Sequence, residues 1–310
     1  MVTYNMALFK NKHFLIGFSF IIILLTSSFV NQIIFGDNII TEKLQYKGGE
    51  LVGTPPFPPS WHHPFGTDTA SQDLLQMVIY GAKFTIITAL VVTICRMVIS
   101  IIIGVFTALY FPRIKKWLTE FGEAFHFFPG TLLTFFLVVS VLTMAYGGFK
   151  YPFMQRWGFE VFIMTIIALP TLTMVISEET DRLKSQQFID ASRLLGAGNL
   201  HIAKWHISPF IRHNLLILAA EQFMNSLLIL AHLGVLKVFL GGTWIDYSPI
   251  KQPPRTVSME WSGLIGSKLD NLLIYPWITL TPIIFFTLTI LAVHSMIIGI
   301  NQQDNKHLNL

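Results

Sequence analysis

The sequence predicts an all-α membrane protein with about six transmembrane helices. Three observations favour this class: the composition, the length of the apolar runs, and the distribution of Lys and Arg between them. Hydrophobic residues make up 53% of the 310 residues and charged residues only 12%, whereas soluble domains carry about 25% charged residues. A chain so poor in charge is expected to place much of its surface in lipid.

Six apolar runs are long enough to cross a bilayer, because about 30 Å of hydrocarbon requires about 20 helical residues. The runs lie at about 14–36, 84–110, 124–146, 159–178, 214–236 and 275–300. The third and fourth contain Pro129 and Pro170, which membrane helices tolerate where neighbouring groups satisfy the freed carbonyls. We find no internal repeat and expect one transmembrane domain over 1–310.

The first run, 14–36, is interpreted as an uncleaved signal anchor. Lys10 and Lys12 precede it, as in the basic region of a signal peptide. The run is long for a signal-peptide core, no small-residue cleavage site follows it, and five further runs come after it. We therefore expect the first helix to remain in the membrane.

The Lys and Arg content of the loops predicts that both termini lie inside the cell. The segments placed inside, 1–13, 111–123, 179–213 and 301–310, hold 11 Lys and Arg, and the longer outer segments hold 9. Cytoplasmic loops of membrane proteins carry the excess of these residues. The expected location is the cytoplasmic membrane of a cell, with several passes through it.

Several function classes have little support in the sequence. The net charge is only +4 and the basic residues form no stripe, so no nucleic-acid partner is expected. The single cysteine, Cys95, excludes an intrachain disulfide, and the adjacent pair His62 and His63 does not share a helix face that could bind a metal. No phosphate-binding loop of the form Gly-x-x-x-x-Gly-Lys-Ser/Thr is present, so we expect no bound cofactor, no ATP hydrolysis and no enzymatic activity in this chain.

Two charged residues fall inside predicted spans. Arg96 lies in the second span and Glu221 in the fifth, and intramembrane charges usually face protein or a water-filled path. They could line a translocation path; alternatively, they form an internal pair, or Arg96 extends to the interface. We interpret His294, in the sixth span, as a packing residue.

The inner loop 179–213 predicts two short helices separated by glycine. Phe188, Ala191, Leu194 and Leu195 recur at helical spacing and form a narrow apolar face on an otherwise polar helix. Such a face, outside lipid, could bind a protein partner or rest on the membrane surface.

Glycines are expected to end the first of these helices. Gly196 and Gly198 stop it, Asn199 can cap the second, and the second helix is expected to end before Pro209.

This loop resembles a known motif. Asp190-Ala191-Ser192, then Gly196, then His206-Ile207-Ser208-Pro209 is similar to the Glu-Ala-Ala…Gly…Leu-Pro motif of ATP-binding-cassette (ABC) importer permeases. The resemblance implies that segment 183–209 docks into a groove on a cytoplasmic ATPase subunit. The implied coupling residues are Asp190, Ala191, Ser192, Leu195, Gly196, Ile207 and Pro209. Asp for Glu, Ser for the second Ala, and Ser208 for Leu are departures from the pattern.

Two further matches narrow the resemblance. His63-Pro64-Phe65-Gly66-Thr67-Asp68, followed by Asp73 and Tyr80-Gly81-Ala82-Lys83, is similar to the outer segment of the C-type oligopeptide, dipeptide and nickel permeases, although the usual Gly-Arg before the second Asp is missing. Phe239-Leu240-Gly241, Pro253-Pro254 and Glu260-Trp261 look like their last outer loop. We expect structural roles for Asp68 and Asp73, such as capping the next helix. The resemblance covers about 60–300.

The resemblance implies an ABC type I importer permease bundle that forms half of a heterodimeric channel. Its implied partners are a second homologous permease subunit, two cytoplasmic ATPase subunits that use the ATP, an extracytoplasmic solute-binding protein and the lipid bilayer. The solute is expected to be a short peptide, with nickel or another small solute as the alternative. A secondary transporter, a membrane-embedded enzyme or an adaptor that anchors the ATPase are the other readings of the chain.

Overall fold

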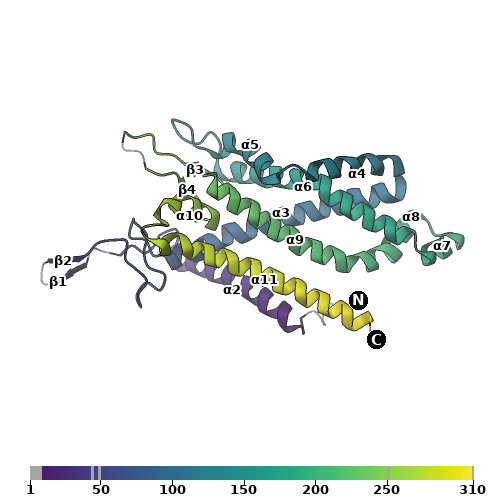
Figure 1. Cartoon of the computed structure of the whole chain (residues 1–310), viewed down its shortest axis with the longest axis horizontal. Helices are drawn as coiled ribbons and strands as arrows, with labels where there is room; N and C mark the ends of the chain where they lie inside the picture. Colours follow the sequence, from purple (N-terminus) through teal and green to yellow (C-terminus); the bar gives the residue numbers. More distant parts are fainter. Residues whose placement is uncertain (1–8, 43–44, 48–49, 250–251, 309–310) are drawn as a thin grey trace.

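The structure is a computed structural model that describes residues 9–42, 45–47, 50–249 and 252–308. Its long helices run side by side along one axis (Figure 1). The helices are α2 (Lys12–Phe35), α3 (Leu74–Tyr110), α4 (Pro112–His126), α5 (Gly130–Leu142), α6 (Phe153–Lys184), α7 (Gln187–Leu194), α8 (Asn199–His201), the π-helix η1 (Ile202–Ile207), α9 (Ser208–Val235), α10 (Trp261–Lys268), the 3₁₀-helix η2 (Leu269–Asn271) and α11 (Pro276–Leu308).

Two small antiparallel hairpins complete the described fold. One pairs β1 (Gln45–Lys47) with β2 (Glu50–Gly53), and the other pairs β3 (Thr243–Trp244) with β4 (Arg255–Thr256). Both hairpins and α10 lie at one end of the bundle, which we call the hairpin end, whereas α7 and α8 lie at the opposite end (Figure 1). The two ends therefore face opposite sides of a membrane that the bundle crosses.

The number of predicted spans agrees with the structure. Among the described residues, five helices are long and apolar enough to cross a membrane, and the bent pair α4 and α5 makes a sixth if it counts as one span. The predicted runs 14–36, 84–110, 159–178, 214–236 and 275–300 fall on α2, α3, α6, α9 and α11. The expected all-α membrane architecture is confirmed.

The predicted third span, 124–146, is wrong as a single helix. Helix α4 ends at His126, α5 begins at Gly130, and the axes bend by 84° between them. Proline disfavours helical geometry at the residue before it, so Pro129 separates the two helices. Because the 13 residues of α5 rise only about 20 Å, α5 needs α4 to complete a crossing. Segment 111–123, expected as an inner loop, belongs mostly to α4.

Small residues allow the helices to approach closely. A Cβ at Gly17 of α2 would collide with the backbone oxygen of Ala292 in α11, and one at Gly122 of α4 would lie 2.9 Å from Met174 in α6. Close helix contact through small residues is typical of membrane bundles. Pro170 is tolerated inside α6, which continues unbroken around it, as expected.

Candidate functional site

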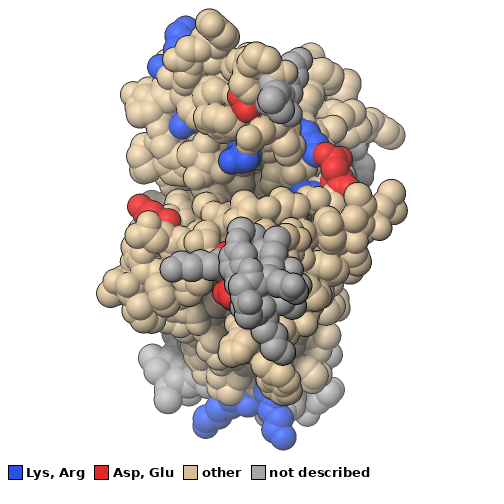
Figure 2. All heavy atoms as spheres, turned by 90° about the vertical axis from the view of Figure 1, so that its left-hand side faces the viewer, with Lys and Arg blue, Asp and Glu red and all other residues tan. Residues whose placement is uncertain are grey.

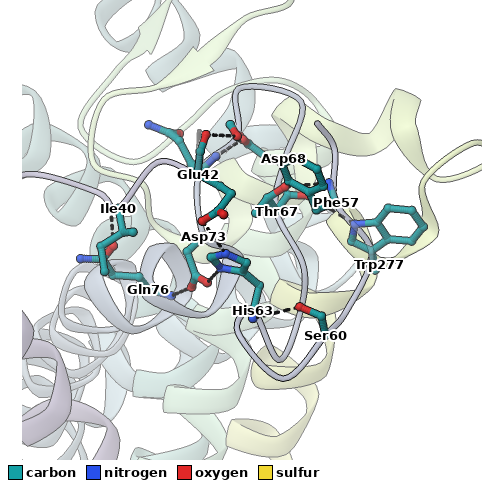
Figure 3. Close-up of polar contacts among 12 residues, drawn as sticks. Ile40, Glu42, Phe57, Ser60, His63, Thr67, Asp68, Asp73, Gln76 and Trp277 are labelled. Atoms are coloured by element: carbon teal, nitrogen blue, oxygen red, sulfur yellow. Dashed lines mark hydrogen bonds and ion pairs between the residues drawn. The ribbon is translucent and has the colours of Figure 1, made fainter. Parts of the chain in front are cut away.

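The segment before α3 is folded around His63 (Figure 3). Its Nδ1 lies 2.7 Å from Asp73 Oδ2 and its Nε2 lies 2.9 Å from Glu42 Oε2. The other carboxylate oxygen of Asp73 accepts a 2.8 Å bond from the Gln76 amide, so Asp73 caps α3, as predicted. The hydrogen bond with Asp73 raises the pKa of His63 most, Glu42 adds to it, and burial opposes it.

The Gly66-Thr67-Asp68 turn connects this segment to α10 through an ion pair. Gly66 has a φ of +78°, a conformation that favours glycine. Asp68 accepts bonds of 2.9 and 2.8 Å from the Ala70 and Gln72 amides and forms an ion pair with Lys268 at the end of α10. Burial lowers the pKa of the Lys268 amine, and the Asp68 carboxylate opposes this effect.

The last outer motif, which contains Glu260 and Trp261, also connects separate elements of the fold. Glu260 caps α10 by accepting a 2.7 Å bond from the Gly263 amide, and it accepts a 3.2 Å bond from the Leu240 amide. Burial raises the pKa of Glu260. The fully buried Trp261 donates its indole N–H to the Val78 carbonyl of α3 at 2.7 Å. These hairpin-end motifs thus hold α3 and α10 together. The sequence analysis did not predict the contacts of Glu42 with His63 or of Lys268 with Asp68.

Arg96 lies in the middle of the bundle, beside a cavity of about 340 Å³ that has both apolar and polar lining residues. Its side chain is buried, with 1% exposed. The Nε and Nη2 atoms donate to the Met164 carbonyl of α6 at 3.0 and 2.6 Å, and Nη1 donates to Gln222 Oε1 of α9 at 3.2 Å. The polar residues around this cavity are Arg96, Thr131, Thr171, Gln222, Asn225 and His232.

Glu221 is not brought together with Arg96. It is exposed and lines a different pocket, nearer to α7, with Glu178, Glu179 and Asn214. Of the three readings given for these two residues, the internal pair is therefore wrong. His294 is also exposed on α11 in this chain, so its interpretation as a packing residue is wrong.

The segment of residues 185–207, which we call the tip segment, forms the end of the bundle opposite the hairpins (Figure 1). Helix α7 ends as predicted: Gly196 has a φ of +88°, and the Ala197 amide donates to the Ser192 carbonyl at 3.1 Å. A left-handed residue with this bond is a common helix C-terminus. Asp190 is exposed and lies 3.6 Å from Arg193.

The second half of the tip segment differs from the expectation. Gly198, not Asn199, is the N-cap residue of α8, and the Asn199 amide instead donates to the Leu109 carbonyl of α3 at 3.3 Å. The helix does not end before Pro209. It passes through η1 into α9, so Pro209 lies inside a continuous helix, where its missing N–H leaves the preceding turn one backbone donor short.

The apolar residues of the tip segment divide into a buried and an exposed group. Ile189 and Ile207, with Ile202, are buried against α3 and α6. Leu194 and Leu195 are each 90% exposed, and Leu200 is 75% exposed. The residues of the predicted apolar face, Phe188, Ala191, Leu194 and Leu195, are all exposed, and Ile189 on another side of α7 makes the core contact. Ala191 is exposed, and Ser192 Oγ lies 2.9 Å from His206 Nε2.

The surface of the hairpin end has few charged groups (Figure 2). Seen from that end, the surface is mostly uncharged, with acidic and basic groups scattered over it and no broad patch of one sign (Figure 2). Among the described residues, no group of three or more His, Cys, Asp or Glu is arranged to hold a metal ion.

No protein-family model matches the chain. A Brucella suis protein designated a peptide transport system permease is 27% identical over 237 residues, covering 76% of this chain and 71% of the relative. The peptide transport system permease protein SapC of Escherichia coli is 24% identical over 259 residues, or 82% and 79% of the two chains. The glutathione transport system permease protein GsiD of Shigella dysenteriae is 23% identical over 234 residues, or 76% and 69%.

The resemblance to transporter permeases is confirmed: the chain is similar to the permease components of peptide transport systems, and its described residues include five or six candidate membrane spans.

Proposed function

We propose that this chain forms half of the translocation path for short peptides in an ATP-driven importer. A second homologous permease subunit supplies the other half, two cytoplasmic ATPase subunits supply the energy, and an extracytoplasmic binding protein delivers the solute. The relatives support this solute class, because their names specify peptides or glutathione, itself a tripeptide.

The observation that carries the proposal is the exposed apolar surface of the tip segment. Leu194, Leu195 and Leu200 stand exposed at the end of the bundle, beyond the helices that cross the membrane. Leucines so exposed to water are typical of a protein-interaction surface. In the proposed orientation this surface lies in the cytoplasm, where an ATPase subunit can bind it.

The connection from the tip segment to α9 suits a coupling element. Ile189 and Ile207 are buried in one apolar cluster with Ile211 of α9, so α7 is attached to the base of that helix. The backbone is helical without a break from Asn199 to Val235. Movement of a bound ATPase would therefore be transmitted to α9, which carries Gln222 beside the central cavity.

The test replaces Gly196 with a large residue. Gly196→Trp should abolish solute uptake, because its left-handed backbone disfavours a side chain and the indole would separate the two proteins. Nothing lies within 4 Å of a Cβ at Gly196, so the membrane helices should still fold. Asp190→Lys should act in the same direction but more mildly, through charge reversal at an exposed position.

The measurement is uptake of labelled trialanine in cells, together with co-purification of the ATPase subunits. Gly158→Trp serves as the control, since this glycine of α6 also has open space around it but lies far along the helix from the tip segment. Normal uptake by Gly196→Trp would contradict the proposed coupling role.

A further inference from the structure

The lining of the central cavity combines apolar side chains with six hydrogen-bonding side chains, of which Arg96 alone carries a permanent charge among the described residues. It lies between the first turn of α5, the middle of α6 and the middle of α9, beside the bend that follows α4. Thr131, Gln222 and Asn225 line it together with His232, and the described lining contains no Asp or Glu. A volume of about 340 Å³ is within the range of small-molecule sites, about 300–1,000 Å³.

Among the described lining residues, the one permanent cation is Arg96, whose hydrogen bonds all go to the protein itself. Arg96 Nε and Nη2 donate to the Met164 carbonyl, Nη1 donates to Gln222 Oε1, and the side chain is 1% exposed. Arginine has five N–H groups in a rigid planar fork, so these three bonds fix its plane. Arg96 is therefore placed to hold its neighbours rather than to meet an anionic solute directly.

The contact with Arg96 sets the orientation of the Gln222 amide. Guanidinium groups donate and cannot accept, so the amide atom that faces Arg96 must be the oxygen. The amide nitrogen then carries its two N–H donors on the other side of the Gln222 head group, which lines the cavity. Gln222 lies 14 residues from the start of α9 and 13 from its end, near the middle of the span.

At the other side of the same cavity, α5 and α9 are linked by a second polar contact. Thr131 Oγ1 lies 3.2 Å from His232 Nδ1, and Asn225, between Gln222 and His232 on α9, is exposed. Amide and hydroxyl groups suit neutral carbonyl and N–H groups, because pairing neutral polar groups requires no charge to be desolvated.

We infer that Gln222, held in place by Arg96, binds the backbone carbonyl groups of a short peptide as it passes through this cavity. This inference rests on the proposed function and specifies its solute contact. Arg96 is a positioning residue, and Gln222 is the specificity-determining residue. A carbonyl is present in every peptide, so this contact would accept peptides of differing side chains.

The experiment measures uptake of trialanine and of its thioamide analogue by the complete transporter. A thiocarbonyl sulfur is a weaker hydrogen-bond acceptor than a carbonyl oxygen, so the wild-type protein should prefer trialanine. Gln222→Leu removes the donor. Gln222→Glu also removes it but keeps the size of the side chain and gives Arg96 a carboxylate partner, so this variant should fold. Gln155→Leu and Gln155→Glu, on an exposed glutamine of α6, are the matched controls.

Both Gln222 variants should take up trialanine at least about tenfold more slowly, with unchanged co-purification of the ATPase subunits. Gln222→Leu should also lose the preference for trialanine over its thioamide analogue, a change that a general packing defect would not produce. Wild-type uptake rates in both variants, an unchanged preference, or loss of assembly in both would overturn the inference. Absence of uptake by the wild-type complex would instead overturn the proposed function, and this inference with it.

Discussion

His63 illustrates how single residues hold the hairpin end together. Each ring nitrogen faces a carboxylate, from Asp73 on one side and Glu42 on the other. Only the protonated ring has an N–H on both nitrogens, so only the cation donates to both carboxylates. The hydrogen bonds from this cation therefore raise the pKa of His63.

This arrangement predicts a pH-dependent stability of the segment before α3. The folded-state pKa of His63 lies above its unfolded value of about 6.5. The stabilisation is then fully present below about pH 6.5 and is lost as the pH rises through the folded-state pKa. Hydrogen exchange of residues 57–73 should become faster as the pH rises above about 6.5, after correction for intrinsic exchange rates.

The variant His63→Gln provides the comparison, because its side chain cannot take a charge. It should remove most of this pH dependence while leaving the Asp73 cap of α3 in place. An identical pH profile in the wild type and in His63→Gln would contradict the assignment to His63.

For single residues, the sequence predicted the role of Asp73 but not the residues that His63 and Asp68 contact. The position of Asp73 directly before an apolar run indicated a helix cap, and the structure confirms it. Glu42 lies 21 residues from His63, and Lys268 lies 200 residues from Asp68. Local spacing carries no information about contacts across such separations, which depend on how the helices pack.

At the scale of elements, the contact between α9 and α10 depends on glycine. A Cβ at Gly234 of α9 would collide with the backbone oxygen of Ser262, and one at Gly266 of α10 would collide with the backbone of Gly234. The backbones of the two helices are therefore in direct contact, and a side chain at either glycine would force the two helices apart.

We expect Gly234→Ala to destabilise the protein. Overpacking in a rigid contact costs about 1–3 kcal/mol, which corresponds to a fall in melting temperature of about 2–4 °C per kcal/mol in a chain of this size class. Gly158→Ala is the control, because nothing lies within 4 Å of a Cβ there. The check is the melting temperature of both purified variants in detergent, and equal values would argue against the close contact.

The elements themselves were predicted unevenly. Long apolar runs identified α2, α3, α6, α9 and α11, because a span must be both apolar and long. The bend between α4 and α5 was missed: the amphipathic α4 was taken for a loop, and Pro129 for a residue inside one helix. Apolar content measures how well a segment suits lipid and is insensitive to the direction of its axis.

For the molecule as a whole, the motifs recognised in the sequence are divided between the two ends of the helix bundle. The three motifs recognised in the sequence lie at opposite ends: two join α3 to α10 at the hairpin end, and one forms the tip segment. Their relative placement was predictable from the spans between them. The central cavity was not, because it is formed by residues of five helices that only the packing brings together.

We expect the tip segment to lie inside the cell and the hairpin end outside. In a Cys95→Ala background, an exposed cysteine introduced at Ser60 should react with a membrane-impermeant maleimide in intact cells. A cysteine introduced at Ser185, in the tip segment, should react only after the membrane is permeabilised, since the Lys and Arg bias places it inside. Labelling of Ser185→Cys in intact cells would reverse the orientation and remove the cytoplasmic ATPase contact.

The π-helical turn at Ile202–Ile207 has a consequence for how this chain can be compared with others. Hydrogen bonds that span five residues instead of four accommodate one additional residue, as in the bond from the Ser208 amide to the Ala203 carbonyl. One residue corresponds to a rotation of about 100° around a helix. The apolar pattern before this turn is thus out of phase with the pattern of α9, although the helix is continuous. An alignment or periodicity search that assumes one uniform helix from 199 to 235 would assign the wrong face to the residues before this turn.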